Sequence, residues 1–350
     1  EIGVRLVGSE MCIRDSFRDR ALSSATGGGA IEGDPDIGIK PATIGTNPFG
    51  KGRLNNGVAT LRRAAEIMTD PMSVNINILA IPGVRDPFVA DHALARTKKY
   101  SQAIYLMDLV KLDESGARLY DDSKARVDVR ETSENFESRG LNNNYGATFF
   151  PDVFINDAQN NQIVKVPASV AALATLGFND KVAFPWFAPA GFNRGALDFV
   201  TNIETRLSSA DRDTLYDARI NPIAVFPRAG FVIFGQKTLQ MQKSALDRVN
   251  VRRMMLEVKR QIVRVANKIL FEPNNAQTRA RFVSQTTPLL ALIQAQQGIE
   301  QFKVVCDDTN NSVRDVEENK LNGRIVVVPT RAIEFIAIDF IITNSGVSFE

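Results

Sequence analysis

The chain has few of the residues that most enzymes and metal proteins use for chemistry. Its 350 residues include one histidine, His92, and two cysteines, Cys12 and Cys306. Catalysis by a histidine–nucleophile pair therefore has one candidate base, and we expect no catalytic residue. A metal site built from several histidines and cysteines is excluded, and no cofactor is expected. Two cysteines also make a disulfide framework untenable.

A strong charge and a long apolar run are missing as well. The chain carries 42 basic and 40 acidic residues, a formal net charge of +2. This balance gives no general attraction to nucleic acid or anionic membranes, so neither is expected as a direct partner. No apolar run approaches the ~18 residues that a membrane span needs. The composition, 44% hydrophobic and 23% charged, is globular, with length for roughly two domains.

The first residues are expected to differ in origin from the rest. Val7 to Ser16 can be back-translated in frame into a transposon-end adapter used for sequencing libraries. We expect residues 1–16 to be an artefact of that adapter, which makes Cys12 non-native and leaves the natural N-terminus missing. Residues 17–57 are rich in Gly, Pro, Asp and Asn, and are expected to be a loop-rich remnant of a truncated N-terminal region.

The next segment has a β-α-β pattern. Apolar spacing predicts helices over Val58–Met68 and Pro87–Tyr100, the second with Phe88, Leu94 and Ala95 facing inward. Apolar runs predict strands, listed in chain order: Val74–Ile81, Ala103–Val110 and Tyr145–Ile155, the last interrupted by Pro151. Pro167 opens a further helix. Apolar strands joined by helices favour a parallel sheet buried on both faces, so residues 58–222 are predicted to form a doubly wound α/β domain.

Three local patterns follow that sheet. Lys181–Gly195 contains four aromatic residues and predicts an ordered apolar loop. Ser208 and Asp211 have the spacing of a capping box at the start of a helix that runs to Ala218. The two apolar segments around Pro227–Gly230 predict a β-hairpin.

Residues 223–350 are predicted to form a second, α+β domain. Apolar residues repeat at helical spacing along one long amphipathic helix: Val251, Met255, Val258, Ile262, Val265 and Ile269. Asn274 is expected to cap the next helix. Phe302–Val305 and Arg324–Val328 are expected strands around a polar loop.

Two sequence motifs resemble ligand sites but lack essential residues. Gly45–Gly52 nearly matches a phosphate-binding P-loop, but Gly52 replaces the Ser or Thr that would hold magnesium after Lys51. Asp307–Asn311 offers oxygen ligands without the glycine and distal glutamate of a calcium loop, and we expect a turn.

The C-terminal segment is the most informative. Ile333–Ile342 is almost continuously apolar, with Glu334 and Asp339 as its only charges. Such a strand needs burial on both faces, either inside its own sheet or by pairing with a neighbouring molecule. The long helix also carries basic residues off its apolar seam, among them Arg252, Arg253, Lys259 and Arg260. They form either a solvated face or a contact strip for an acidic partner.

From about Asn144 onward the chain resembles the tail sheath protein of contractile-tailed bacteriophages, close to the T4-like myovirus branch. The matching stretches occur in the family's order: NYGATFFPDVFI, VPASVAALATLGFND, PWFAPAGFNRG, LYDARINPIAVFPRAGFVIFGQKTLQ, DRVNVRRMMLEVKRQIVRVANKILFEPNN, FKVVCDDTNN and AIEFIAIDFIITNSG. They cover roughly the last 200 residues. Two departures are Ala332-Ile333, where many relatives have a proline before the glutamate, and the missing N-terminal arm.

The resemblance implies a structural role. It implies a subtilisin-like middle domain without protease function, and a C-terminal sheath domain whose arm, residues 333–349, adds strands to neighbouring subunits. The implied arm residues are Ile333, Phe335, Ile336, Ile338, Phe340, Ile342 and Phe349. The basic strip, Arg252, Arg253, Lys259 and Arg260, would face the tail tube.

The implied partners are copies of the same chain, in hexameric rings stacked into a helical tube, together with tail tube, baseplate and tail terminator proteins. The implied location is the virion tail, assembled in the host bacterial cytoplasm, where contraction drives the tube through the host envelope. Three alternatives stay open: the sheath of a phage-derived injection particle, a P-loop or subtilisin-like hydrolase, and a generic oligomeric binding module.

Overall fold

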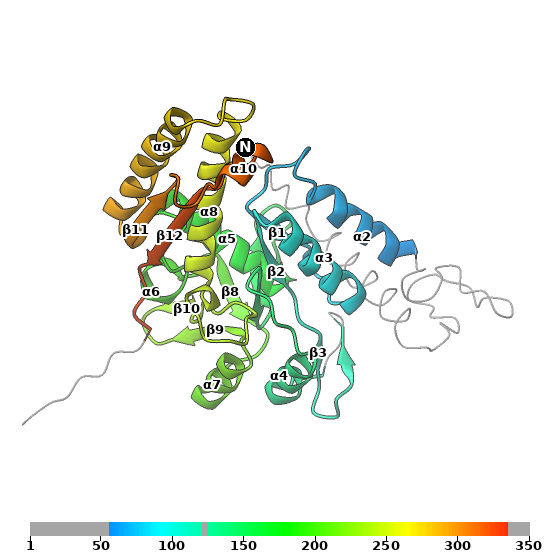
Figure 1. The fold of residues 1–350 in the computed structure, drawn as a ribbon. Coiled ribbons are helices and arrows are strands. Elements are labelled where there is room, and N and C mark those ends of the chain that lie inside the picture. Colours follow the sequence, from blue (N-terminus) through cyan, green and yellow to red (C-terminus); the bar gives the residue numbers. More distant parts are fainter. Residues whose placement is uncertain (1–55, 121–124, 335–350) are drawn as a thin grey trace, which may run out of the picture.

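A five-stranded sheet forms the centre of the molecule in a computed structural model, which describes residues 56–120 and 125–334 (Figure 1). The strand order is β1-β2-β5-β9-β10; the first four strands run parallel, and β10 is antiparallel to β9. The strands are β1 (Ile78–Ala80), β2 (Ile104–Met107), β5 (Gly146–Phe150), β9 (Asn221–Phe226) and β10 (Gly230–Ile233). The predicted parallel sheet is confirmed, although β1 is shorter than expected.

Both faces of this sheet are covered, as its apolar strands require. In β2, Tyr105 and Met107 face the core beneath helices α3, α4 and α7, whereas Ile104 and Leu106 face the core beneath α5 and α8. Helix α2 packs against α3 (Figure 1). The helices are α2 (Asn56–Met68), α3 (Pro87–Tyr100), α4 (Val129–Ser138), α5 (Ala168–Val182), α7 (Ser209–Asp217) and α8 (Val249–Asn267). The doubly wound α/β fold is therefore confirmed.

Most of the predicted local patterns are present. Helix α3 has the predicted bounds, and Leu94 is buried, but the inward prediction is wrong for Ala95, which is exposed. The core face of α3 follows Ala90, Ala93 and Leu94, and Ala95 lies about 100° from Leu94 around the helix. Phe88 is half-buried. The Ser208–Asp211 capping box and the β9–β10 hairpin are both formed.

The predicted strand over Tyr145–Ile155 is two strands in different sheets. After β5, the chain passes Pro151 and enters a three-stranded antiparallel sheet of order β7-β6-β8. Pro151 has no backbone N–H to donate to a ladder, which explains the division at that point. The remaining strands here are β6 (Val153–Asp157), β7 (Gln162–Val166), β8 (Val200–Ile203) and a short pair, β3 (Lys111–Leu112) and β4 (Arg118–Leu119).

A buried ion network joins the two sheets where β2 and β5 end. Asp152 accepts hydrogen bonds from Arg85 at 2.7 Å and from Lys111 at 2.8 Å, and Lys111 also contacts Glu204 at 3.0 Å. Lys165 contacts the same Glu204 at 2.5 Å. Burial alone would raise the pKa of Asp152, but the nearby Lys111 and Arg85 outweigh it and hold that pKa well below its usual range. Asp152 is thus ionised at neutral pH.

The C-terminal unit consists of α8, α9 (Ala276–Ala295) and a two-stranded ribbon, β11 (Ile299–Val305) and β12 (Arg324–Pro329). The predicted seam is confirmed: Val251, Val258, Val265 and Ile269 are buried, and Met255 and Ile262 pack beside them. The predicted cap is wrong, because Asn275 accepts the hydrogen bond from the backbone N–H of Thr278. The neighbouring Asn274 donates to the Lys320 carbonyl instead.

The aromatic loop at Lys181–Gly195 packs the C-terminal unit against the first unit. Trp186, 8% exposed, stacks on Phe184 with ring centroids 4.9 Å apart and packs among core residues of α8 and α9. Its indole N–H donates to the Gln296 carbonyl at 2.9 Å. The predicted ordered loop is therefore confirmed. Three short helices complete the described part of the fold: α6 (Gly191–Arg194), the 3-10 helix η3 (Ala245–Asp247) and α10 (Val313–Glu317).

The predicted domain boundary at residues 222 and 223 falls within β9. Asn221 and Pro222 pair with Phe149 and Phe150 of β5, and β10 pairs with β9. The hairpin is therefore hydrogen-bonded into the first sheet, and that boundary is wrong. We place the start of the C-terminal unit after β10, near η3.

Neutralising the centre of the buried ion network tests its contribution to stability. Asp152→Asn keeps the side-chain shape but removes the charge that Arg85 and Lys111 share, so we expect the free energy of unfolding to fall by about 3 kcal/mol. Urea unfolding followed by circular dichroism measures it. Glu134→Gln removes an exposed partner of Arg130 and serves as the control. Equal stability of both variants would contradict the assigned role.

Candidate inter-subunit site

The β11–β12 ribbon pairs with no further strand in the described part of the chain. Phe302 pairs with Val327 and Val304 with Ile325, and these four side chains pack toward α8 and α9. The opposite face exposes Val326 (47%) and Val328 (43%). Figure 1 shows the ribbon at the periphery, beside α9.

Within the described residues no strand pairs with either outer edge of this ribbon, although the Glu300 carbonyl of β11 accepts a hydrogen bond from the Gln294 side chain at 2.8 Å. An isolated two-stranded ribbon is marginal in water, and an apolar open edge invites pairing with another chain. β12 reads RIVVVP, too apolar for a strand that solvent covers on one face. The ribbon is therefore suited to receive an added strand.

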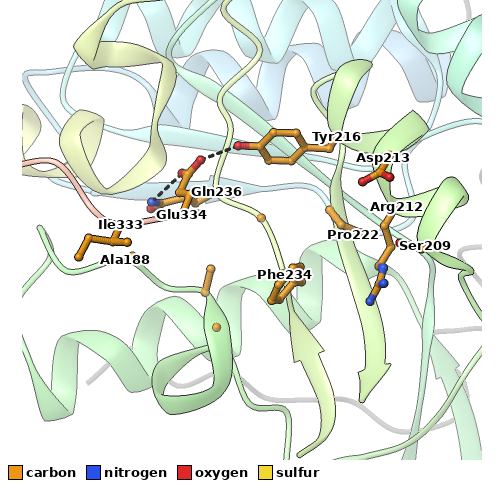
Figure 2. Close-up of a pocket in the computed structure, with 13 residues that line it drawn as sticks. Ala188, Ser209, Arg212, Asp213, Tyr216, Pro222, Phe234, Gln236, Ile333 and Glu334 are labelled. Carbon is orange, nitrogen blue, oxygen red and sulfur yellow. Dashed lines mark hydrogen bonds between the residues drawn. The ribbon is translucent and has the colours of Figure 1, made fainter. Parts of the chain in front are cut away.

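A second candidate site lies where the described chain ends. The Glu334 carboxylate accepts hydrogen bonds from three residues. Arg248, at the start of α8, donates two, at 2.6 and 2.9 Å. In the first unit, the Tyr216 hydroxyl donates one at 2.5 Å and Gln236 donates one at 3.2 Å. We call these four residues the Glu334 cluster. Figure 2 shows the bonds from Tyr216 and Gln236. Arg248 also contacts Asp247 at 3.2 Å.

The Glu334 cluster is charged at neutral pH. Burial would raise the pKa of Glu334, but hydrogen bonds from Arg248 and Tyr216 outweigh it and hold that pKa below its usual value. Burial, and then the bond to Glu334, raise the pKa of Tyr216. Since the Glu334 pKa is lowered in the fold, the cluster stabilises the protein above the ordinary glutamate pKa of about 4.3. That stability is lost as the pH falls through the lowered value.

A cavity of about 310 Å³ lies beside the cluster. Its walls are partly apolar, with Ala188, Phe234 and Ile333, and partly charged, with Arg212 and Glu334 (Figure 2). The first predicted arm residue, Ile333, is 83% exposed. The other predicted arm residues lie outside the described residues: Phe335, Ile336, Ile338, Phe340, Ile342 and Phe349.

The predicted basic strip does not form one exposed face. Arg252 is 7% exposed and lies 3.5 Å from the centre of the Tyr145 ring. Arg253 is 4% exposed and bonds to Asp180 at 2.5 Å. The prediction of a tube-facing strip is therefore wrong for these two arginines, because the first unit covers that side of α8.

The other two residues of the strip also bond across the same junction. Arg260 donates to the backbone carbonyls of Ile76 and Gln102, each at 3.2 Å. Lys259 is more exposed, and its ammonium donates to the Ser101 hydroxyl. These contacts attach α8 to the loops before β1 and β2. A tube contact by Lys259 or Arg260 stays a prediction.

The remaining sequence candidates have structural partners or lie outside the described residues. His92 is half-buried, and its Nε2 lies 3.4 Å from Glu66 of α2; burial lowers the pKa of His92. The Asp307–Asn311 segment is a turn in which Asp307 accepts from the Thr309 N–H at 2.9 Å. Asp308 pairs with Arg279 at 2.8 Å. The P-loop-like segment 45–52 lies outside the described residues.

Two further kinds of site are absent from the described ranges. Among residues 56–120 and 125–334, no group of three or more His, Cys, Asp or Glu side chains could hold a metal ion. No helix in those ranges has the length and apolar character to cross a membrane.

Known sequences resemble the chain most clearly in its C-terminal part. Residues 241–343 match the family described as phage tail sheath C-terminal domain. The chain is 39% identical over 189 residues to the tail sheath protein of Vibrio phage KVP40, and 36% identical over 190 residues to that of Enterobacteria phage T4. Each match covers 54% of this chain and 28% of the phage protein. The chain is thus homologous to these tail sheath proteins over the matched part, which is less than a third of their length.

Solved structures share the fold over more of the chain. The anti-feeding prophage helical sheath in its contracted state has a TM-score of 0.62 at 19% identity, covering 95% of this chain and 81% of the other. A chain of the anti-feeding prophage baseplate has a TM-score of 0.65 at 18% identity, covering 86% and 82%. These likenesses establish that the chain has the fold of a contractile-system sheath subunit.

Removing the two bonds that Arg260 makes across the α8 junction tests whether they stabilise the fold. Arg260→Met keeps the apolar stem but loses the two bonds to the carbonyls, so we expect the free energy of unfolding to fall by about 1–2 kcal/mol. Arg264→Met, one turn further along the same helix, changes an exposed side chain and is the matched control. Urea unfolding would contradict the assignment if both variants lost the same stability.

Proposed function

We propose that this chain is part of a structural subunit of a contractile phage tail sheath. The subunit polymerises helically around a tail tube and contracts to drive the tube through the host envelope. The observation that carries the proposal is the β11–β12 ribbon, which has unpaired edges within the described residues and lies inside the segment that matches sheath C-terminal domains. The homology to phage tail sheath proteins supports the same conclusion.

The polymer is held together by strand addition between subunits. The part of the arm beyond the Glu334 cluster, residues 335–342, is apolar apart from Asp339, and an extended strand of eight residues would be about 26 Å long. This arm lies beside β11 or β12 of a neighbouring subunit and completes its ribbon. Because one surface of each subunit receives a different surface of the next, such contacts generate an open helix.

The further partners follow from a sheath's place in the particle. They are other copies of the chain in stacked hexameric rings, the tail tube, the baseplate and the tail terminator; the location is the virion tail after assembly in the host cytoplasm. The first unit corresponds to a subtilisin-like domain without protease function. A sheath of a phage-derived injection particle has the same subunit chemistry, and the likeness to the anti-feeding prophage structures supports that second candidate.

We propose no catalytic role for the chain. His92, its one histidine, lies against Glu66 between α2 and α3, and burial lowers the His92 pKa. Among the alternatives, a P-loop hydrolase would require Lys51, so ATP turnover that is lost in Lys51→Ala would overturn this part of the proposal.

Truncation tests the arm directly. A variant that lacks residues 335–350 keeps the Glu334 cluster but has no strand to add to a neighbour. We therefore expect this variant to stay monomeric where the intact protein forms tubes or rings. Negative-stain microscopy and sedimentation measure the difference. Tubes of unchanged yield after the truncation would contradict the assignment of the arm.

Charging the exposed face of β12 tests the receiving ribbon. Val326→Lys with Val328→Lys places two ammonium groups beside the incoming apolar strand, which should abolish tubes while the far-ultraviolet circular dichroism of the monomer stays unchanged. Ile163→Lys, at a 68% exposed position on β7, is the matched control and should assemble normally. Normal assembly of the double variant would exclude this face as part of the interface.

A further inference from the structure

One carboxylate attaches the end of the described chain to the body of the subunit. After β12, Thr330 donates its backbone N–H to the Gly298 carbonyl at 3.2 Å. Arg331, Ala332 and Ile333 are then exposed. Glu334 follows: the residue as a whole is also exposed, but its side chain is only 19% exposed and makes four hydrogen bonds. The segment is thus held firmly at two points, four residues apart.

The residues that hold Glu334 belong to fixed parts of the fold. Tyr216 lies on α7, Gln236 follows β10, and Arg248 occupies the N-cap position of α8 (Figure 2 shows the first two). Gln236 is itself 3% exposed, and Lys237 lies 3.4 Å from the centre of the Tyr216 ring. The cluster therefore has little freedom to move relative to the first sheet.

We propose that Glu334 is a positioning residue, and that the Glu334 cluster fixes the place and direction from which residues 335–350 leave the subunit. The inference rests on the proposed function, in which those residues pair with a neighbour. The β11–β12 ribbon is proposed to receive a strand from a neighbouring subunit. The Glu334 cluster is proposed to orient the arm that the subunit itself contributes. It is a separate site, formed by the first unit and the beginning of α8.

The physical advantage is a higher effective concentration of the arm at its target. Without the cluster, the last fixed point would be Thr330, and four extra residues would give the arm a free tether of about 13–14 Å. A longer tether dilutes the attached segment over a larger volume, and any fixed starting direction is lost. Assembly would then need a higher concentration of subunits.

Glu334→Gln is the sharpest variant, because it keeps the size of the side chain and removes its charge. Hydrogen bonds that involve a charged group are the stronger ones, so their loss should weaken the attachment by about tenfold. Glu317→Gln, at an exposed position on α10, is the matched control. Tyr216→Phe removes a single donor and provides a second variant if the first folds poorly. The exchange Arg248→Glu with Glu334→Arg should restore part of the attachment.

Two measurements on the full-length protein separate attachment from assembly. In monomers, the rate of trypsin cleavage after Arg331, followed by mass spectrometry, should rise about tenfold in Glu334→Gln and stay unchanged in Glu317→Gln. In assembly assays, the subunit concentration needed for tubes should rise by a similar factor in Glu334→Gln. Tyr216→Phe should lie between the two.

The outcomes distinguish this inference from the proposed function. If truncation of residues 335–350 abolishes tubes but Glu334→Gln cleaves and assembles like the unchanged protein, the positioning role is overturned and the sheath function stands. Faster cleavage of Glu334→Gln with normal assembly also overturns the positioning role, because attachment of Glu334 would then have no effect on how the arm pairs with a neighbour. If the truncated protein forms normal tubes, the arm assignment itself fails, and the positioning role fails with it.

Discussion

Burial of helix α8 on two sides is the constraint on which the rest of the structure depends. Val249 and Leu256 pack into the core of the five-stranded sheet, whereas Met254 and Val258 pack into the core that α9 and the ribbon share. One helix therefore belongs to both hydrophobic cores. Burying apolar surface on both sides, with a contribution of roughly 25 cal/mol for each Å² removed from water, fixes the ribbon relative to the sheet.

That arrangement accounts for the positions of the two candidate sites. The Glu334 cluster begins at the N-terminus of α8 through Arg248, and the ribbon packs along the same helix. A load applied to the arm of one subunit would pass through Glu334 into α8 and the first sheet. A load on the receiving ribbon would enter α8 from the other side. In the proposed sheath, such a link would connect the surface that provides the arm to the surface that receives it.

Periodicity and turn chemistry predict most of the fold, because those signals are local. The helix at Pro87, the capping box at Ser208 and the seam from Val251 to Ile269 all follow from residues within a few turns of one another. The errors arise where a distant segment decides the outcome. Arg252 looks like a surface residue in the helical pattern, yet Tyr145, more than a hundred residues earlier, covers it.

In the candidate sites, too, local features are predictable from the sequence and contacts with distant segments are not. The apolar arm is visible in the sequence, and Glu334 stands out as one of its two charges. Its partners are not predictable, since Arg248 and Tyr216 lie 86 and 118 residues away in the sequence. The open edges of the ribbon likewise depend on which strands pair, and no local pattern reports that β11 and β12 pair with each other alone in the described residues.

Disulfide crosslinking between subunits tests the central claim, that the arm of one subunit completes the ribbon of another. In the chain with Cys12→Ser, the buried Cys306 is the one cysteine left. One copy would carry Val326→Cys, and a second copy, of different size, would carry one introduced cysteine moved along residues 335–342. The account predicts crosslinked heterodimers in assembled tubes, with yields that alternate every second residue, as strand pairing requires. Tubes that form normally but give no heterodimer at any position would contradict it.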